Sequence, residues 1–163
     1  MKYREMAGEK ISVLGFGCMR FPTTSKNAED IDAEKSAKML VYAIENGVNY
    51  FDTAYVYHGG KSESFIGGVL KPYRDKIHIA TKCPIWEVKC EEDFDRLLNE
   101  QLERLQTDYI DFYLMHALDK DRFKNVVEKF NLIDKLNKAK ADGKIRHIGF
   151  SFHDDVETLK KII

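Results

Sequence analysis

The sequence predicts an α/β fold of the (β/α)8 TIM-barrel type, with about the first five βα units present after an N-terminal β-hairpin. Apolar stretches of strand length alternate with longer stretches of helical spacing, the pattern of βα units and a parallel sheet. The expected strand ends follow one another at intervals of 30 to 35 residues, at Gly17, Asp52, Lys82, His116 and Ser151. Eight such units typically need ~250 residues, and this chain has 163.

We therefore expect residues 1–163 to be the N-terminal portion of a single barrel domain, an incomplete barrel. An open, five-stranded, doubly wound sheet is the alternative at this length. The first strand is followed by GFGCMR and not by the GxGxxG loop of dinucleotide-binding sheets, which weighs against that alternative.

The first half of the chain predicts a hairpin, three strands and two helices. Residues 3–17 turn at Gly8, and Gly15 and Gly17 mark the end of the first parallel strand. Strands two and three are expected at 48–54 and 77–82. The helix after strand one has Asp32 as its cap, Asn46-Gly47 at its end, and an apolar face of Ala37, Leu40, Val41 and Ile44. The next helix has Ser62 as its cap, Pro72 at its end, and an apolar face of Phe65, Ile66, Val69 and Leu70.

The second half predicts two further strands and three helices. The strands are expected at 109–116 and 146–153, and a last helix begins in the segment 154–163. The third helix has an apolar stripe of Phe94, Leu97, Leu98, Leu102 and Leu105. We expect one continuous fourth helix, closed by Gly143, with a stripe of Val126, Val127, Phe130, Ile133, Leu136 and Ala139.

Composition and charge restrict the class of protein. The net charge is −1, from 26 basic and 27 acidic residues, which predicts no nucleic-acid partner and no anionic membrane surface and favours a small, roughly neutral ligand. Cys18, Cys83 and Cys90 form no CxxC pair, so we expect a reducing compartment. The charged N-terminus and the lack of an apolar run of ~20 residues favour a cytoplasmic protein.

Four residues carry the candidate chemistry. Asp52, Lys82 and His116 each end an apolar segment, and Tyr57 follows Asp52 by five residues. Barrel enzymes keep their catalytic groups at the carboxyl ends of the strands. A lysine ammonium makes a nearby tyrosine a stronger acid, and a carboxylate keeps that ammonium charged. A histidine can donate a hydrogen bond to a carbonyl oxygen. The pattern predicts a proton donor opposite a polarised carbonyl, which a hydride source would turn into a reductase.

Other interpretations stay open at this point. Each of the four residues has a structural interpretation when taken alone, and His58, His78 and His147 have no metal-ligand spacing and fit surface or local hydrogen-bonding roles. Cys18 and Cys83 fit packing roles. A barrel-strand lysine also suits a Schiff-base aldolase that uses Lys82. The third alternative is a non-catalytic, cofactor-sensing or inert half-barrel.

The motifs resemble those of the aldo/keto reductase family. The matching segments are NYFDTAYVYHGGKSE, IATK, YLMH and GKIRHIGFS, in family order. The resemblance implies that Tyr57 is the general acid, that Lys82 assists it, that Asp52 pairs with Lys82, and that His116 orients the substrate carbonyl. It also implies hydride transfer from NADPH or NADH to an aldehyde or ketone, without a catalytic metal.

The resemblance also implies which residues contact the cofactor. They are Gly17, Met19, Arg20, Asp52 and Ser151. The fifth strand of the family usually ends in Ser-Asn, and this chain has Ser151-Phe152, so the asparagine that normally contacts the nicotinamide amide is replaced. Strands six to eight of the family, whose loops hold the rest of the cofactor, have no counterpart in residues 1–163, so the preference between NADP and NAD is not readable.

Several longer phrases resemble one bacterial and archaeal branch of the family. They are LGFGCMRFP, TKCPIWEV, NEQLERLQTDYIDFYLMHALD and GKIRHIGFSFHDD. Members of that branch carry a C-terminal ferredoxin-like segment with an iron–sulfur cluster, which would exist only in a longer form, because this chain has no cysteine cluster. If the chain does end at Ile163, its open sheet edges favour self-association.

Overall fold

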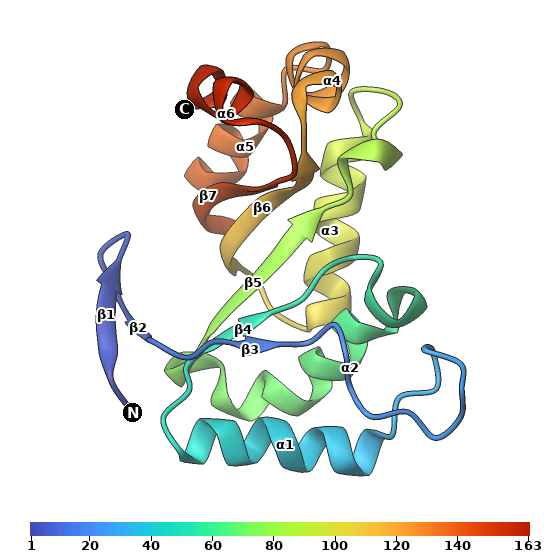
Figure 1. Ribbon diagram of the computed structural model, residues 1–163, viewed down its shortest axis with the longest axis vertical. Helices are drawn as coiled ribbons and strands as arrows, with labels where there is room; N and C mark the ends of the chain where they lie inside the picture. Colours follow the sequence, from blue (N-terminus) through green and yellow to red (C-terminus); the bar gives the residue numbers. More distant parts are fainter.

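A computed structural model describes residues 1–163 as a β-hairpin followed by a five-stranded parallel sheet with helices along one side (Figure 1). The hairpin strands are β1 (Tyr3–Met6) and β2 (Glu9–Ser12). The sheet has the order β3-β4-β5-β6-β7, and each neighbouring pair is parallel. Its strands are β3 (Phe16–Gly17), β4 (Tyr50–Asp52), β5 (His78–Cys83), β6 (Ile110–Leu118) and β7 (Ile145–Phe152). The predicted fold class, an incomplete TIM-type barrel after a hairpin, is confirmed.

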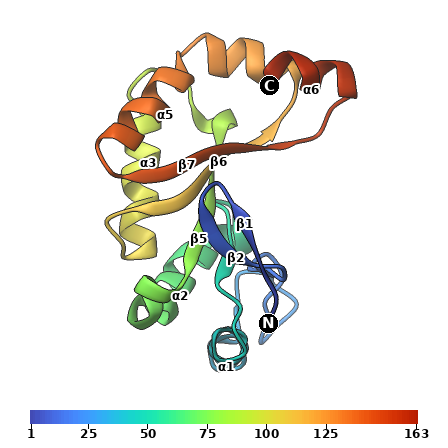
Figure 2. The ribbon, with the colours of Figure 1, turned by 90° about the vertical axis from the view of Figure 1, so that its left-hand side faces the viewer.

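The main helices alternate with the strands along the chain. They are α1 (Ala33–Glu45), α2 (Lys61–Leu70), α3 (Asp93–Leu105), α5 (Leu132–Ala141) and α6 (Val156–Ile162), with the single turn α4 (Lys120–Arg122) before α5. Short 3-10 segments occupy 57–60, 71–76 and 85–87, and a π-helical segment spans 123–128. In Figure 2 the helices follow the outer side of the curved sheet, and the hairpin lies at its other side.

Alternation along the strands separates the two faces of the sheet. Phe51 and Ile79 face the helices and belong to a buried cluster of 26 apolar residues, the main core. Asp52 and Lys82, at the alternate positions, belong to the opposite, inner face. On that inner face, Ala80 and Phe112 form a small second cluster with Ile11 of the hairpin.

The hairpin covers the amino ends of the strands. The Asn49 side chain, directly before β4, accepts a hydrogen bond from the Ser12 backbone N–H at 2.7 Å and donates one to the Lys10 carbonyl at 2.8 Å. The hairpin is thus held at the amino end of β4, away from the carboxyl ends of the strands.

The cap prediction is correct for α1 and wrong for α2. The Asp32 side chain accepts a hydrogen bond from the Lys35 N–H, and α1 runs into Asn46-Gly47 as expected. Helix α2 begins one residue before Ser62, after Gly60, and has no side-chain cap. Gly60 has a φ of 88°, which supplies the sharp turn into the helix. The Ser62 hydroxyl is buried and makes tertiary hydrogen bonds, described below.

The expectation of one continuous fourth helix is wrong. The segment divides into α4, the π-helical residues 123–128 and α5, with a break at Asn131. Asn131 has a φ of 51°, a left-handed conformation that asparagine tolerates better than most residues. The break rotates the helical face, so Leu132 is fully buried and Ile133, predicted as buried, is exposed.

Strands β3 and β7 form the two edges of the sheet, because each has only one strand neighbour. The five strands of this chain therefore make an open, curved sheet and not a closed barrel.

Helix α2 packs so closely on α3 that we expect Gly67→Ala to destabilise the fold. A Cβ atom at Gly67 would lie 2.5 Å from the Arg104 carbonyl oxygen, which is backbone and cannot turn aside. Overpacking of this kind costs about 1–3 kcal/mol. The control is Gly68→Ala, where the nearest atom is the flexible end of Gln106 at 3.7 Å. Urea unfolding should show Gly68→Ala at or above parental stability, and equal loss in both variants would contradict this packing.

Candidate active site at the carboxyl ends of the strands

The candidate residues lie on the inner face at the carboxyl ends of neighbouring strands. Asp52 pairs with Gly17 on one side and with Ala80 on the other, and Lys82 pairs with Leu114. Ala80, the partner of Asp52, lies two positions before Lys82 on β5. Leu114, the partner of Lys82, lies two positions before His116 on β6. Because side chains alternate with a period of two, this stagger keeps Asp52, Lys82 and His116 on the same face.

Lys82 is the centre of the site, with a side chain that is 7% exposed. Its ammonium donates to Asp52 Oδ1 at 2.7 Å, to the Thr53 carbonyl at 2.7 Å and to the Tyr57 hydroxyl at 3.2 Å. An ammonium has three N–H donors, and all three have partners. The predicted ion pair with Asp52 is present, and the arrangement brings Asp52, Tyr57 and Lys82 together.

Tyr57 stands on the loop between β4 and α2, and its neighbour His58 fastens that loop. His58 is buried, with a φ of 54°. Its Nε2 accepts a hydrogen bond from the Phe21 backbone N–H at 3.1 Å, and its Nδ1 donates to the Ala28 carbonyl at 2.5 Å. This pairing needs a neutral ring with the proton on Nδ1. The predicted role of His58 in local hydrogen bonding is confirmed.

His116 completes the group of four through its ring contacts. Its ring lies edge-on to Tyr57 at a centroid distance of 6.1 Å and packs on Trp86 at 5.1 Å. Its buried Nδ1 has no hydrogen-bond partner within the protein. Burial, with the positive charges of Lys82, His153 and Arg122, lowers the pKa of the His116 imidazole to about 4. His116 is therefore neutral at pH 7 and has one N–H to donate.

A β-bulge follows His116 and involves Ser151. Ala117 has a φ of 54°, and the pairing of β6 with β7 shifts between Met115 and Leu118. The Ser151 hydroxyl oxygen accepts a hydrogen bond from the Ala117 N–H at 2.7 Å. Ser151 therefore lies beside the end of the strand that carries His116, with its hydroxyl proton still available to a ligand.

The other expected cofactor residues follow strand β3. Gly17 lies beside Asp52 in the sheet, and a Cβ atom at Gly17 would meet nothing within 4 Å. Met19 and Arg20 are exposed. Cys18, between Gly17 and Met19, is buried, and its N–H donates to the Asp52 carbonyl at 2.7 Å. The space beside Asp52 is thus open at Gly17, with exposed side chains next to it.

Several residues of the site were not identified from the sequence as parts of it. Trp86 packs beside His116, and the Arg122 guanidinium lies 5.8 Å from the centre of the Trp86 ring. Glu63 and Gln101 are fully buried polar residues behind Lys82. A tryptophan four residues after Lys82 was a usable signal for Trp86, whereas nothing local indicated Gln101, which belongs to a distant helix.

The buried thiols fit packing roles, as predicted. Cys18 and Cys83 are fully buried. Burial raises the pKa of the Cys83 thiol to about 12 and raises that of Cys18 further. Neither thiol is a nucleophile at neutral pH. The structure has no group of three or more His, Cys, Asp or Glu side chains arranged to hold a metal ion, and none of its helices has the length and apolar character of a membrane span.

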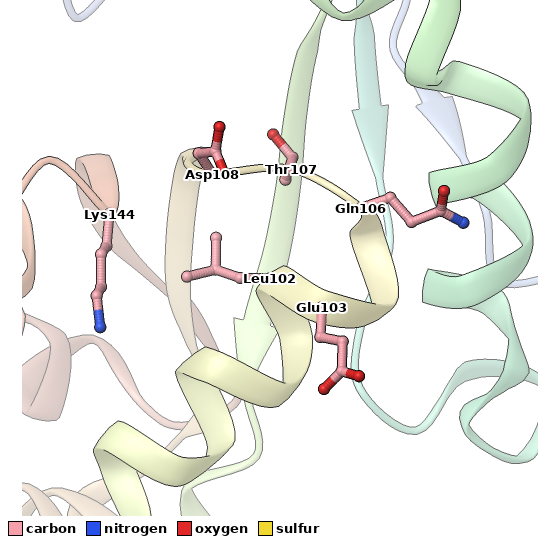
Figure 3. Close-up of a pocket in the computed structure, with 6 residues that line it drawn as sticks. All are labelled: Leu102, Glu103, Gln106, Thr107, Asp108 and Lys144. Atoms are coloured by element: carbon pink, nitrogen blue, oxygen red, sulfur yellow. The ribbon is translucent and has the colours of Figure 1, made fainter.

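A surface hollow of about 400 Å³ lies at the other end of the sheet. Figure 3 shows its lining at the end of α3, the following loop and Lys144: Leu102, Glu103, Gln106, Thr107, Asp108 and Lys144. The loop precedes β6, so the hollow is at the amino ends of the strands, and Leu102 is its one apolar residue. It has no part in the site described above.

The chain belongs to the aldo/keto reductase family. A sequence model of the "Aldo/keto reductase family" matches residues 13–162. The chain is 32% identical to a "Probable aldo-keto reductase 1" of Glycine max over 153 residues, which cover 88% of this chain and 42% of that protein. It is 32% identical to "L-galactose dehydrogenase" of Arabidopsis thaliana over 151 residues, 88% of this chain and 46% of that protein. The chain spans about half the length of these curated relatives.

Solved structures of the family are also similar. An aldo-keto reductase from Bacillus halodurans, in its holo form, matches with a TM-score of 0.76 and 31% identity over 93% of this chain and 50% of that one. An aldo/keto reductase from Klebsiella pneumoniae, in complex with NADP and acetate, matches with a TM-score of 0.73 and 27% identity. The match covers 93% of this chain and 49% of that one. The five βα units thus correspond to about half of a family barrel.

We predict that His116 stays neutral throughout the physiological pH range. Burial and nearby positive charge hold its pKa at about 4, so its ring should gain a proton only as the pH falls toward 4. NMR of the imidazole C–H resonances measures this directly, with His116→Gln to assign the signal. A midpoint near the ordinary value of ~6.5 would contradict the described burial of the ring.

Proposed function

We propose that this chain contributes the catalytic half of an NADPH- or NADH-dependent oxidoreductase that reduces an aldehyde or ketone. The observation that carries the proposal is the Tyr57 hydroxyl, 3.2 Å from an ammonium that is itself bonded to Asp52. A phenol next to a fixed cation is a proton donor suited to a carbonyl oxygen. The NADP complex of the similar Klebsiella pneumoniae protein supports the choice of cofactor.

The residues at the open end of β3 and β4 fit a nicotinamide ring. The backbone beside Asp52 is accessible at Gly17, where no neighbouring atom lies within 4 Å of a built Cβ. Met19 and Arg20 would lie against the cofactor, and the Ser151 hydroxyl would reach its amide. NADPH or NADH, when bound, supplies a hydride to the carbonyl carbon.

Tyr57 would donate its proton to the carbonyl oxygen as the carbon accepts the hydride. The C=O π bond breaks, C–H and O–H bonds form, and the products are an alcohol, the oxidised cofactor and a tyrosinate. The Lys82 ammonium, held by Asp52 and the Thr53 carbonyl, stabilises that tyrosinate until water reprotonates it. The neutral His116 would donate its single N–H to the same oxygen and so orient it.

The alternative of a Schiff-base aldolase is less consistent with the state of Lys82. Attack on a carbonyl needs a free amine with a lone pair. The Lys82 nitrogen has three acceptors around it, one of them the Asp52 carboxylate at 2.7 Å. With three N–H groups engaged in this way, the Lys82 nitrogen has no lone pair directed at a substrate.

Four further parts of the proposal concern the extent of the domain, its compartment, its assembly and a longer form. We infer that residues 1–163 are the N-terminal portion of one barrel domain, because five of the parallel strands of a family barrel are present. The free thiols of Cys18, Cys83 and Cys90 favour a reducing compartment, the cytoplasm. The open edge strands β3 and β7 would favour self-association of a chain of this length. An iron–sulfur cluster would require a longer form.

The direct test is Tyr57→Phe in the protein that carries this sequence. We expect kcat/KM for reduction of an aromatic aldehyde by NADPH to fall about 10²- to 10⁴-fold, because general acid catalysis contributes that much. Cofactor binding, measured by fluorescence, should change little. The control is Tyr55→Phe, two residues away, whose hydroxyl bonds to the carboxylate of Glu100.

Parental activity in Tyr57→Phe would overturn the assignment of the general acid. Cofactor binding without turnover in the parent would support a sensor. If borohydride trapped a carbonyl compound on Lys82 of the parent, the aldolase would become the better description.

A further inference from the structure

We infer that Glu63 and Gln101 are positioning residues that hold Lys82 at its working place from behind the sheet. Neither side chain touches the ammonium or lies where a substrate would bind. Both are fully buried, and together they form the buried contact between the start of α2, the middle of α3 and the end of β5.

Gln101 fastens the backbone of Lys82 directly. Its amide nitrogen donates to the Lys82 carbonyl at 3.2 Å and to Glu63 Oε1 at 2.5 Å. Its amide oxygen accepts from the Tyr113 hydroxyl at 2.8 Å. The amide is thus held in one orientation, with a proton pointed at the carboxyl end of β5.

One carboxylate oxygen of Glu63 holds both Gln101 and Thr81, the residue before Lys82. Oε1 accepts from Gln101 and also from the Thr81 hydroxyl at 2.6 Å. Oε2 faces Arg104 Nη1 at a longer distance, 3.4 Å. Burial raises the pKa of the Glu63 carboxyl, and the hydrogen bonds from Thr81 and Gln101 and the charge of Arg104 partly oppose this rise. The acceptor at Oε1 is the part of Glu63 that holds both Thr81 and Gln101.

Ser62, the residue before Glu63, joins the ends of β3 and β4 to the first turn of α2. The Ser62 hydroxyl donates to the Cys18 carbonyl at 3.0 Å and lies 2.9 Å from the Thr53 hydroxyl. Thr53 supplies the carbonyl that holds the Lys82 ammonium. One turn of α2 thus sets the ends of β3, β4 and β5 relative to one another, and with them the Tyr57–Lys82 distance.

This geometry predicts different results for two substitutions of similar length. Glu63→Met keeps the volume and removes the acceptor, so the Thr81 hydroxyl loses its acceptor and the Gln101 amide loses one of its partners. We expect kcat to fall about 10- to 100-fold, the loss typical of a displacement of ~1 Å in a catalytic group, while KM changes little. Glu63→Gln keeps an amide oxygen at the Oε1 position and should restore kcat to near the parental value. Ser64→Ala, at the exposed neighbouring position, is the control.

Two readouts separate positioning from simple loss of stability. In Glu63→Met the loss should appear in kcat and not in KM, because the residues expected to contact the substrate and the cofactor are unchanged. Lys82 should also become several-fold more reactive toward acetic anhydride, measured by peptide mass spectrometry relative to the exposed Lys38. If Glu63→Met does not fold, Glu63→Asp, which withdraws the carboxylate by one methylene, should show the same changes to a smaller degree.

The kinetic part of this inference rests on the proposed reductase function, whereas the labelling part does not. A parent without carbonyl reduction would remove the proposed function, and the reactivity of Lys82 would still decide the positioning role. Parental Lys82 reactivity in the folded Met or Asp variant would overturn that role. So would a Gln variant as impaired as the Met variant, since it would show that the oxygen acceptor is not what matters.

Discussion

The site depends on one buried ammonium. Removal of Lys82 from water would be costly without partners, and the fold supplies three: the Asp52 carboxylate, the Thr53 carbonyl and the Tyr57 hydroxyl. These partners come from the end of β4 and the loop after it, so a single charge fixes the relation of two strands and a loop. The same charge helps to keep His116 neutral. The position of the Lys82 nitrogen at the end of β5 therefore determines the charge around Asp52, Tyr57 and His116.

Much of this arrangement was predictable because it follows from strand periodicity. Asp52, Lys82 and His116 end successive apolar segments, and parallel strands bring their carboxyl ends to one edge. The expected ion pair between Asp52 and Lys82 is present at 2.7 Å. Their roles in catalysis remain a proposal, as do the cofactor contacts expected of Gly17, Met19, Arg20 and Ser151.

Sequence patterns failed where tertiary contacts override local preference. Serine is a common helix-capping residue, but the Ser62 hydroxyl instead joins the ends of β3 and β4. Gly60 provides the turn into α2. The apolar stripe of the predicted fourth helix concealed the left-handed Asn131, which lets Leu132 replace Ile133 in the core. Glu63 and Gln101 meet across 38 residues of sequence, a separation that no local pattern reports.

The most direct test of the proposed reduction follows the hydride itself. The protein that carries this sequence is incubated with an aldehyde and NADPH deuterated at C4 of the nicotinamide, and the alcohol is analysed by mass spectrometry. We expect deuterium on the former carbonyl carbon in the parent and a large loss of this transfer in Lys82→Met, with the cofactor still bound. No deuterium in the alcohol of a folded, cofactor-bound parent, or undiminished transfer without the Lys82 ammonium, would contradict it.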